Sequence, residues 1–317
     1  MSSKKKCALV VFSGGLDSQL AVKVLEAAGC EVAALTFVSP FFSSEKAERA
    51  AENLGIEIFK EDFSEKILDL VKDPPHGFGK NLNPCLDCHA AMFRQAHDFT
   101  EQNNFQIIAS GEVLGQRPFS QNREALGRVA KYAGVEILRP LSAKLLPPTS
   151  FEEQGLVDRE KLLDLSGRSR KPQMALAKKF GIQDYPAPAG GCLLTEPTFA
   201  QKLRTLLEHY PEAGAEDVKL LKIGRFLILG KSSFSVIGRD QTDNKLLEQL
   251  RDSQNYLVAM RDFVGPTALV RVHSPDSFKE IFPLVAEKIK SYGRDSKKAT
   301  GKITFQINGA ISEIREL

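Results

Sequence analysis

The sequence predicts an α/β protein, with a doubly wound parallel sheet in its first half and a smaller α+β domain after it. Two patterns lead to this prediction. As far as residue 148, apolar runs of strand length alternate with segments of helical periodicity, which is typical of parallel strands joined by helices. From about Asp217 onward, most of the regular segments are strand-like. We therefore expect three parts: residues 1–148, a helical linker of residues 149–212 that carries a cysteine, and an α+β domain of residues 213–317.

The elements of the first half follow from the spacing of its apolar residues. The expected strands are residues 7–12, 31–37, 56–60, 106–110 and 135–138. The expected helices are residues 19–28, 44–54, 64–71, 86–101 and 123–132. Ligands of doubly wound sheets bind at the carboxyl ends of the strands. The turn after residue 12, the pair Thr36 and Phe37, and the pair Gly111 and Glu112 are therefore expected to converge on one crevice.

The second half is predicted in the same way. Two short helices are expected in the linker, over residues 158–165 and 171–180, before an irregular segment rich in Pro and Gly. The strands expected beyond the linker are residues 218–223, 226–229, 234–237, 256–260, 267–272 and 303–307. The helices expected there are residues 244–251 and 277–290.

The composition is that of an ordinary globular protein, with 42% hydrophobic and 26% charged residues in a chain of 317. No apolar run approaches the roughly 20 residues of a membrane helix, and the run at residues 7–12 is too short for a signal peptide. We therefore expect a cytoplasmic protein with no membrane partner. The net charge of +3 says little about partners by itself. Five cysteines in a cytoplasmic chain favour metal, redox or catalytic roles over structural disulfides.

The most informative segment is the turn Ser13, Gly14, Gly15, Leu16, Asp17, Ser18, which follows the first expected strand and opens the first expected helix. A helix start directs free backbone N–H groups and a positive dipole end at an anion. The two glycines let the backbone approach a ligand closely, and the two serine hydroxyls are further donors to phosphate. The turn lacks the Walker ending and the three-glycine dinucleotide pattern. It predicts a nucleotide site; the alternative is a tight turn that binds nothing.

Three cysteines stand outside the apolar runs. Cys85 and Cys88 open a helix, and Cys192 lies in the irregular segment. Three thiolates can ligate three irons of a [4Fe–4S] cluster. Alternatively, one thiol carries a persulfide and another resolves it, or His89 or His97 completes a zinc site. The helix start is expected to lower the pKa of its thiols. Cys7 and Cys30 are expected to be buried and inert.

Several segments resemble known families. The turn Ser13–Ser18 resembles the PP-loop of ATP pyrophosphatases, which adenylate a substrate and release pyrophosphate. Residues 83–88 resemble the motif around the first catalytic cysteine of tRNA 2-thiouridine synthases, with Cys88 at that place, and Cys192 matches the second in position. Cysteine at the place of Cys85 is associated with iron–sulfur-dependent members. Residues 110–116 resemble a segment of the 4-thiouridine synthetases.

The resemblance implies an adenine nucleotide alpha-hydrolase-like fold and ATP-dependent thiolation of a tRNA uridine. In this hypothesis ATP binds with Mg²⁺, the base is adenylated, and sulfur from hydrosulfide or a persulfide carrier such as a cysteine desulfurase displaces AMP. The implied catalytic residues are Cys88, Cys192 and Asp17. The implied ATP-binding residues are Ser13, Gly14, Gly15, Asp17, Ser18, Thr36 and Phe37 (adenine), and Gly111 and Glu112 (ribose or base). The implied ligands of a [4Fe–4S] cluster are Cys85, Cys88 and Cys192.

The last hundred residues resemble the RNA-binding module of some ribosome-quality-control proteins. The matching positions are Gly224 with Arg225, Gly238 and Arg239 with Asn244, and residues 260–271. Basic residues are spread through this part of the chain, and their positive charges could contact the phosphates of a nucleic acid. They are Lys219, Lys222, Arg225, Lys231, Arg239, Arg294, Lys297, Lys298 and Lys302. The expected partner is tRNA; the alternative is an ordinary solvated surface.

Two other functions remain open from the sequence. One is a PP-loop sulfurtransferase or ligase that acts on a small molecule, and the basic C-terminal domain argues against it. The other is a non-catalytic RNA-binding protein with a nucleotide site, against which the intact Ser13–Ser18 turn and the three cysteines argue.

Overall fold

The computed structural model describes residues 7–118, 120–187, 191–230, 232–252, 255–272, 274–296, 301–308 and 312–316. The chain divides into two compact units, Met1–Thr195 and Glu196–Leu317. We call them the first and the second unit. Lys231, Lys297 and Lys298, which belong to the basic set named above, lie outside the described residues.

The first unit is built on a four-stranded parallel sheet with the order β3-β2-β1-β4. Its strands are β1 (Cys7–Val11), β2 (Glu31–Val38), β3 (Ile58–Asp62) and β4 (Ile107–Ser110). This confirms the doubly wound parallel sheet expected from the sequence. The strand expected at residues 135–138 is reduced to one bridge between Leu138 and Ala109, beside β4.

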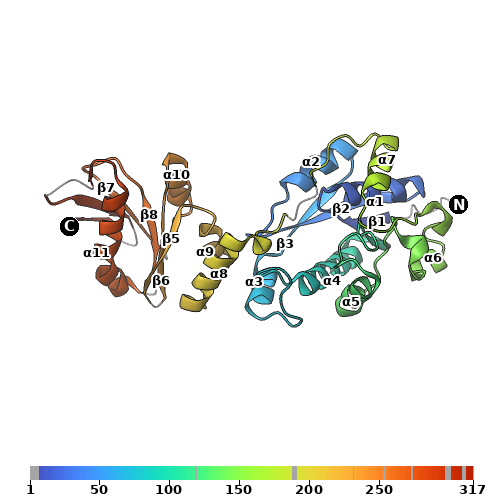
Figure 1. The fold of residues 1–317 in the computed structure, drawn as a ribbon, viewed down its shortest axis with the longest axis horizontal. Coiled ribbons are helices and arrows are strands. Elements are labelled where there is room, and N and C mark those ends of the chain that lie inside the picture. Colours follow the sequence, from blue (N-terminus) through green and yellow to red (C-terminus); the bar gives the residue numbers. More distant parts are fainter. Residues whose placement is uncertain are drawn as a thin grey trace. The chain divides into compact units, whose positions relative to one another are not determined.

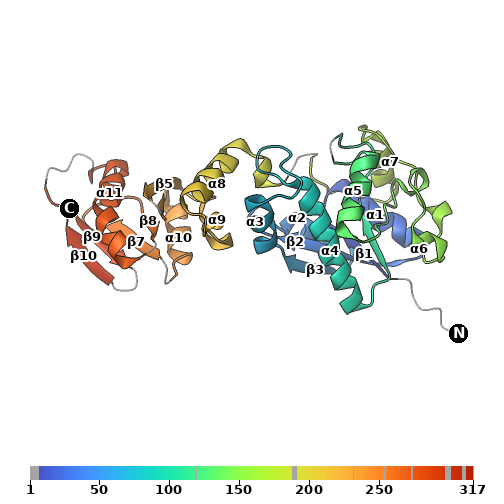
Figure 2. The same ribbon diagram turned by 90° about the horizontal axis from the view of Figure 1, so that it is seen from below.

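Helices cover both faces of this sheet (Figures 1 and 2). One face carries α1 (Leu16–Ala27), α2 (Glu45–Leu54) and α7 (Lys171–Lys179). The other carries α3 (Ser64–Lys72), α4 (Cys85–Asn103) and α5 (Arg123–Ala133). Burial on both faces explains why β1 and most of β2 read as continuous apolar runs.

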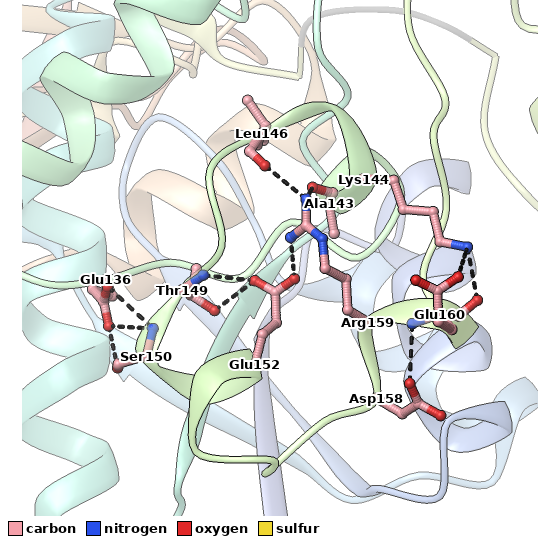
Figure 3. A network of polar contacts seen from close by, with 10 residues as sticks. All are labelled: Glu136, Ala143, Lys144, Leu146, Thr149, Ser150, Glu152, Asp158, Arg159 and Glu160. Carbon is pink, nitrogen blue, oxygen red and sulfur yellow. Dashed lines mark hydrogen bonds and ion pairs between the residues drawn. The ribbon is translucent and has the colours of Figure 1, made fainter.

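The segment that follows the sheet folds back onto the first unit. Arg159 donates to the carbonyl oxygens of Ala143 and Leu146, each at 2.8 Å, and pairs with Glu152 of the short helix α6 (Ser150–Glu153) (Figure 3). Side chains from this segment enter the core of the first unit, among them Val157, Leu162, Ala177 and Ile182. The unit therefore ends at Thr195, whereas the sequence set residues 149–212 apart as a linker. The helix expected at residues 158–165 is only the 3₁₀ turn Arg159–Lys161.

The second unit contains a six-stranded antiparallel sheet with the order β10-β9-β7-β8-β6-β5, which confirms the smaller α+β domain. The strands are β5 (Arg225–Gly230), β6 (Ser233–Ile237), β7 (Asn255–Met260), β8 (Ala268–Arg271), β9 (Thr304–Asn308) and β10 (Ser312–Glu316). The helices are α8 (Pro197–His209), α9 (Ala215–Leu220), α10 (Gln241–Gln249) and α11 (Pro275–Tyr292). Helix α11 packs its apolar face, including Phe278, Phe282 and Ile289, onto the sheet.

The strand expected at residues 218–223 is wrong, because α9 ends within that range. The backbone N–H of Gly214 donates to the side chain of Asp217 at 3.0 Å, which fixes a helix start just before the apolar run. A short apolar run by itself does not distinguish a buried strand from a buried helix.

Across the described residues, no helix has both the length and the apolar character needed to cross a membrane.

Candidate active site

The turn between β1 and α1 forms the floor of the candidate site. Gly14 has φ +72°, and a Cβ there would lie 2.3 Å from the carbonyl oxygen of Lys46 in α2, so only glycine fits. Gly15 is the N-cap of α1 and has no side-chain cap hydrogen bond. Buried Gln19 donates to the carbonyl oxygens of Gly14 and Asp184, which fixes the turn against a distant loop. The first N–H groups of α1 therefore remain available to an anion.

Asp17 carries a buried oxygen that has no protein partner. Gln116 donates to its Oδ2 at 2.8 Å, while Oδ1 has no hydrogen-bond partner among the described residues. Burial raises the pKa of Asp17, although the Gln116 hydrogen bond and the charges of Arg170 and Arg117 oppose the rise. Nε of Arg170 and Oε1 of Gln173 are also buried and unpartnered in the described structure. The helix start is thus lined by polar atoms that a phosphate and its cation would satisfy.

Gly111 and Glu112 follow β4, as expected, but their contacts in the structure are with other residues of the first unit. A Cβ on Gly111 would lie 2.5 Å from the backbone of both Asp17 and Ser18, so β4 ends directly against the start of α1. The buried carboxylate of Glu112 lies 3.0 Å from Nε of Arg139 and 3.4 Å from Nδ1 of His89. Burial would raise its pKa, but the nearby His89 and the Arg139 charge lower the pKa to about 2. The predicted contact of Glu112 with ribose or base stays a prediction.

Thr36 and Phe37 lie inside the first unit. Both are 5% exposed, and β2 continues beyond them to Val38. The Phe37 ring packs on Phe63 with centroids 5.4 Å apart. The contact of these two residues with adenine also stays a prediction.

The three candidate cysteines converge although one is distant in sequence. Helix α4 begins at Cys85, whose Sγ donates to Oδ1 of Asn83 at 3.1 Å, and Cys88 lies one turn further along the same face. Cys192 precedes the 3₁₀ turn Leu193–Thr195. Three hydrogen bonds dock that turn: Leu193 N–H to Phe41 O (3.0 Å), Leu82 N–H to Leu194 O (3.3 Å), and Asn81 Nδ2 to Thr195 O (2.8 Å).

The pKa of each of these thiols is raised, so the expected lowering is wrong. Burial is the largest cause for all three. Negative charge on Cys192 and Cys85 further raises the pKa of Cys88, and Cys85 does the same to Cys192, whose pKa is about 11. The three sulfurs are therefore close enough that the charge on one affects the pKa of another.

The described residues contain no group of three or more His, Cys, Asp or Glu spaced as ligands of a single metal ion. Both histidines considered for a zinc site face carboxylates, His89 toward Glu112 and His97 toward Glu101 at 3.6 Å. A cluster with several irons needs a different arrangement, in which each thiolate binds its own iron. Three thiolates that repel one another when ionised suit such a group, because positive iron would relieve the repulsion.

The charge of Arg117 acts both on the Ser13–Ser18 turn and on one of the three cysteines. Arg117 is exposed on the loop after β4, and its charge lowers the pKa of both Asp17 and Cys85. A single guanidinium therefore lies near the start of α1 and the start of α4 together. No sequence signal pointed to the contact of Gln116 with Asp17 or to that of His89 with Glu112. These polar contacts join segments far apart in sequence, so no local pattern marks them.

Comparisons with known proteins address the first unit. Residues 3–144 match the model of the family described as Thiamine biosynthesis protein (ThiI). The tRNA-specific 2-thiouridylase MnmA of Campylobacter curvus (strain 525.92) is 27% identical over 155 residues, which are 43% of this chain and 46% of that protein. The chain thus spans less than half the length of this relative. These similarities support a PP-loop protein of the tRNA thiolation type; they do not test the resemblance of the last hundred residues.

Solved structures are similar only at a low level. One is the predicted subunit of a tRNA methyltransferase from Methanocaldococcus jannaschii, with 18% identity, a TM-score of 0.37, and coverage of 55% of this chain and 76% of that one. Another is a 4-thiouridine synthetase–RNA complex with bound ATP, with 21% identity, a TM-score of 0.36, and coverage of 68% and 52%.

Proposed function

We propose that the protein is an ATP-dependent tRNA sulfurtransferase, which adenylates a uridine and replaces the activated oxygen with sulfur. The observation that carries the proposal is the position of Arg117, whose charge acts on Asp17 and on Cys85. The position of Arg117 supports a single reaction space for the turn Ser13–Ser18 and the thiols, as a two-step transfer requires.

In the first step, the turn Ser13–Ser18 binds the phosphates of ATP through the free N–H groups of α1. Oδ1 of Asp17 is the unpartnered oxygen that would hold Mg²⁺, and Arg170 and Arg117 flank it with positive charge. Mg²⁺ supplies charge neutralisation at the phosphates when bound. The uridine oxygen attacks the α-phosphorus, the bond to the leaving oxygen breaks, and pyrophosphate departs. The contacts of Thr36 and Phe37 with adenine, and of Gly111 and Glu112 with the ribose or base, belong to this proposal.

In the second step, a sulfur nucleophile adds to the adenylated carbon and AMP leaves. A [4Fe–4S] cluster held by Cys85, Cys88 and Cys192 would supply an iron that binds hydrosulfide. Without a cluster, a persulfide on Cys88 or Cys192, loaded by a persulfide carrier, delivers its outer sulfur. The other thiol then breaks the S–S bond, and the resulting disulfide requires an external thiol reductant. The convergence of three thiols favours the cluster, because the persulfide route needs only two.

The second unit is proposed to bind tRNA. Lys219 and Lys222 lie close enough to affect each other: burial, and then the charge of Lys219, lower the pKa of Lys222. An anion nearby would relieve this repulsion. The Arg225 guanidinium, in the same unit, lies over the Tyr292 ring, 4.5 Å from its centroid. Because both units belong to one chain, RNA bound by one is held at high effective concentration for the other.

Nucleoside mass spectrometry of tRNA from a deletion strain tests the proposal directly. The expected result is the loss of one thionucleoside, which purified protein restores in that tRNA with ATP and a sulfur donor while releasing pyrophosphate. An unchanged thionucleoside profile would overturn the proposal. Anaerobic purification distinguishes the two sulfur routes: iron and visible absorption lost on Cys85→Ala, Cys88→Ala and Cys192→Ala support the cluster, and full activity without iron excludes it.

A further inference from the structure

Two glutamines form a relay of hydrogen bonds that ends on Asp17. Gln173 is the third residue of α7 and is buried, with 1% of its surface exposed. Its Nε2 donates to Oε1 of Gln116 at 3.4 Å, and Nε2 of Gln116 donates to Oδ2 of Asp17 at 2.8 Å. The relay therefore joins three segments that are far apart in sequence: the start of α7, the loop after β4 and the first turn of α1.

The chemistry of the partners sets the orientation of both amides. A carboxylate oxygen accepts a hydrogen bond, so Gln116 presents its amide nitrogen to Asp17 and turns its oxygen away from it. That oxygen in turn needs a donor, which is the amide nitrogen of Gln173. Oε1 of Gln173 has no hydrogen-bond partner among the described residues. The burial of this amide is therefore not explained by the satisfaction of its own polar groups.

The segments that carry the two glutamines are held together by other hydrogen bonds. The N–H of Gly167, shortly before α7, donates to the carbonyl oxygen of Leu114 at 2.8 Å. The hydroxyl of Ser142 donates to the carbonyl oxygen of Leu165 at 2.6 Å and accepts from the N–H of Leu114 at 3.0 Å. The loop after β4 is thus fixed to the segment before α7 by its backbone, so the glutamine side chains are not needed to join the two.

Asp17 has two positively charged neighbours that compete for its carboxylate. The charges of Arg170 and Arg117 both act on Asp17, and Nε of Arg170 is buried without a hydrogen-bond partner in the part of the chain that the structure describes. A guanidinium that pairs with a carboxylate can engage both of its oxygens. Here Gln116 engages Oδ2 instead, and Oδ1 has no partner among the described residues. The Gln116 hydrogen bond thus keeps one oxygen of Asp17 available.

We propose that Gln173 is a positioning residue for Asp17 that acts through Gln116. The proposal rests on the ATP-binding step of the proposed function. Gln173 orients the amide of Gln116, Gln116 holds Oδ2 of Asp17, and Oδ1 stays presented to the Mg²⁺ that accompanies ATP. Loss of either amide lets the carboxylate turn toward Arg170 or Arg117, so that Mg²⁺ contributes less to the affinity for ATP.

Isothermal titration of the full chain with ATP, in one buffer with Mg²⁺ and in another with EDTA, tests this role. Gln173→Met and Gln116→Met keep the length of the side chain but remove the donor. We expect each to reduce the gain in ATP affinity that Mg²⁺ brings by about 3- to 10-fold, while the dissociation constant in EDTA stays that of the wild type. Because Gln173 acts through Gln116, the double variant should bind ATP no more weakly than Gln116→Met alone.

Gln173→Glu reverses the relay at nearly constant side-chain size. A carboxylate facing Oε1 of Gln116 turns that amide round, so that its oxygen faces Asp17. This variant should therefore reduce the Mg²⁺ gain more than Gln173→Met does. Gln95→Met is the matched control, because Gln95 of α4 also donates to a carboxylate, that of Glu61 at 2.8 Å. It should bind ATP as the wild type does in both buffers.

Three results would overturn the role of Gln173: a wild-type Mg²⁺ gain in Gln173→Met, an equal loss of affinity in both buffers, or additive effects of the two Met substitutions. The titrations use no tRNA, so an unchanged thionucleoside profile in the deletion strain would overturn tRNA sulfur transfer and leave the relay standing. If Mg²⁺ does not raise the affinity of the wild type for ATP, the place of Asp17 in the proposed first step falls, and the relay falls with it.

Discussion

Among single residues, Asp17 carries a carboxylate whose ionisation opposes folding. Its folded pKa is raised, mainly by burial, so the folded state holds the proton more tightly than the unfolded chain does. The free energy of unfolding therefore falls as the pH rises from the ordinary Asp pKa of 3.8 through the raised value, and stays reduced at neutral pH.

We accordingly expect Asp17→Asn to raise the free energy of unfolding, measured with urea at pH 7, by up to about 1 kcal/mol, and to leave it unchanged below pH 4. The same variant should slow pyrophosphate release by on the order of 10²-fold, since it removes the charge that Mg²⁺ needs. Asp98→Asn, an exposed carboxylate on α4, is the matched control for both measurements. Unchanged pyrophosphate release would remove Asp17 from the site.

Cys192 allows a prediction about alkaline pH. Its pKa rises from 9.0 to about 11 in the folded protein, chiefly through burial. The unfolded thiol loses its proton first, so the free energy of unfolding falls as the pH rises from 9 toward 11. In iron-free, reducing buffer, Cys192→Ser should diminish the fall between pH 8 and pH 10 by about 1 kcal/mol.

Among the elements, the contact between the end of β4 and the start of α1 determines the shape of the site. Gly111 leaves no room for a Cβ, which would lie 2.5 Å from the backbone of Asp17 and Ser18. Gly111→Ala should therefore displace the helix start, weaken ATP binding, and lower the free energy of unfolding by about 1–3 kcal/mol. Isothermal titration with ATP and urea unfolding measure the two effects.

Gly127→Ala is the counterpart within the same unit. Gly127 lies inside α5, and a Cβ there would have no neighbour within 4 Å. This substitution should raise the free energy of unfolding by about 0.5–1 kcal/mol without changing ATP affinity. If Gly111→Ala proved as harmless as Gly127→Ala, the close approach of β4 to α1 would not hold in solution.

The elements also show what the sequence can predict. The strand–turn–helix at Ser13–Ser18 was predictable, because apolar period, glycine positions and helix start all lie within one short segment. The burial of Thr36 and Phe37 was not, because a strand's end depends on its neighbour: β2 pairs with β3 as far as Val38 and Asp62. The raised pKa of Cys88 could not be predicted either, because it arises from burial and from Cys192, more than a hundred residues away in the sequence.

At the scale of the whole molecule, the boundary between the units follows from the cores. Residues as late as Ile182 enter the core of the first unit, and the core of the second unit is separate, with Phe278 and Phe305 among its members. The sequence shows the change in character near residue 217 but not which core the intervening helices join. Each unit has enough buried apolar surface of its own to be expected to fold alone.

The division of labour between the units leads to a prediction about salt. If the second unit supplies phosphate contacts, log Kd for tRNA should vary with log salt concentration, and each lost contact should reduce that slope by about 0.7–0.9. We expect Lys222→Gln with Arg225→Gln to lower the slope by about 1–2 and weaken tRNA binding, with ATP affinity unchanged. Lys279→Gln, whose exposed ammonium already pairs with Asp276 at 3.0 Å, should leave the slope unaltered. The control removes one positive charge and the double variant two, so a control effect half that of the double variant would indicate general attraction rather than a defined RNA surface. No effect of the double variant would place tRNA recognition elsewhere in the chain.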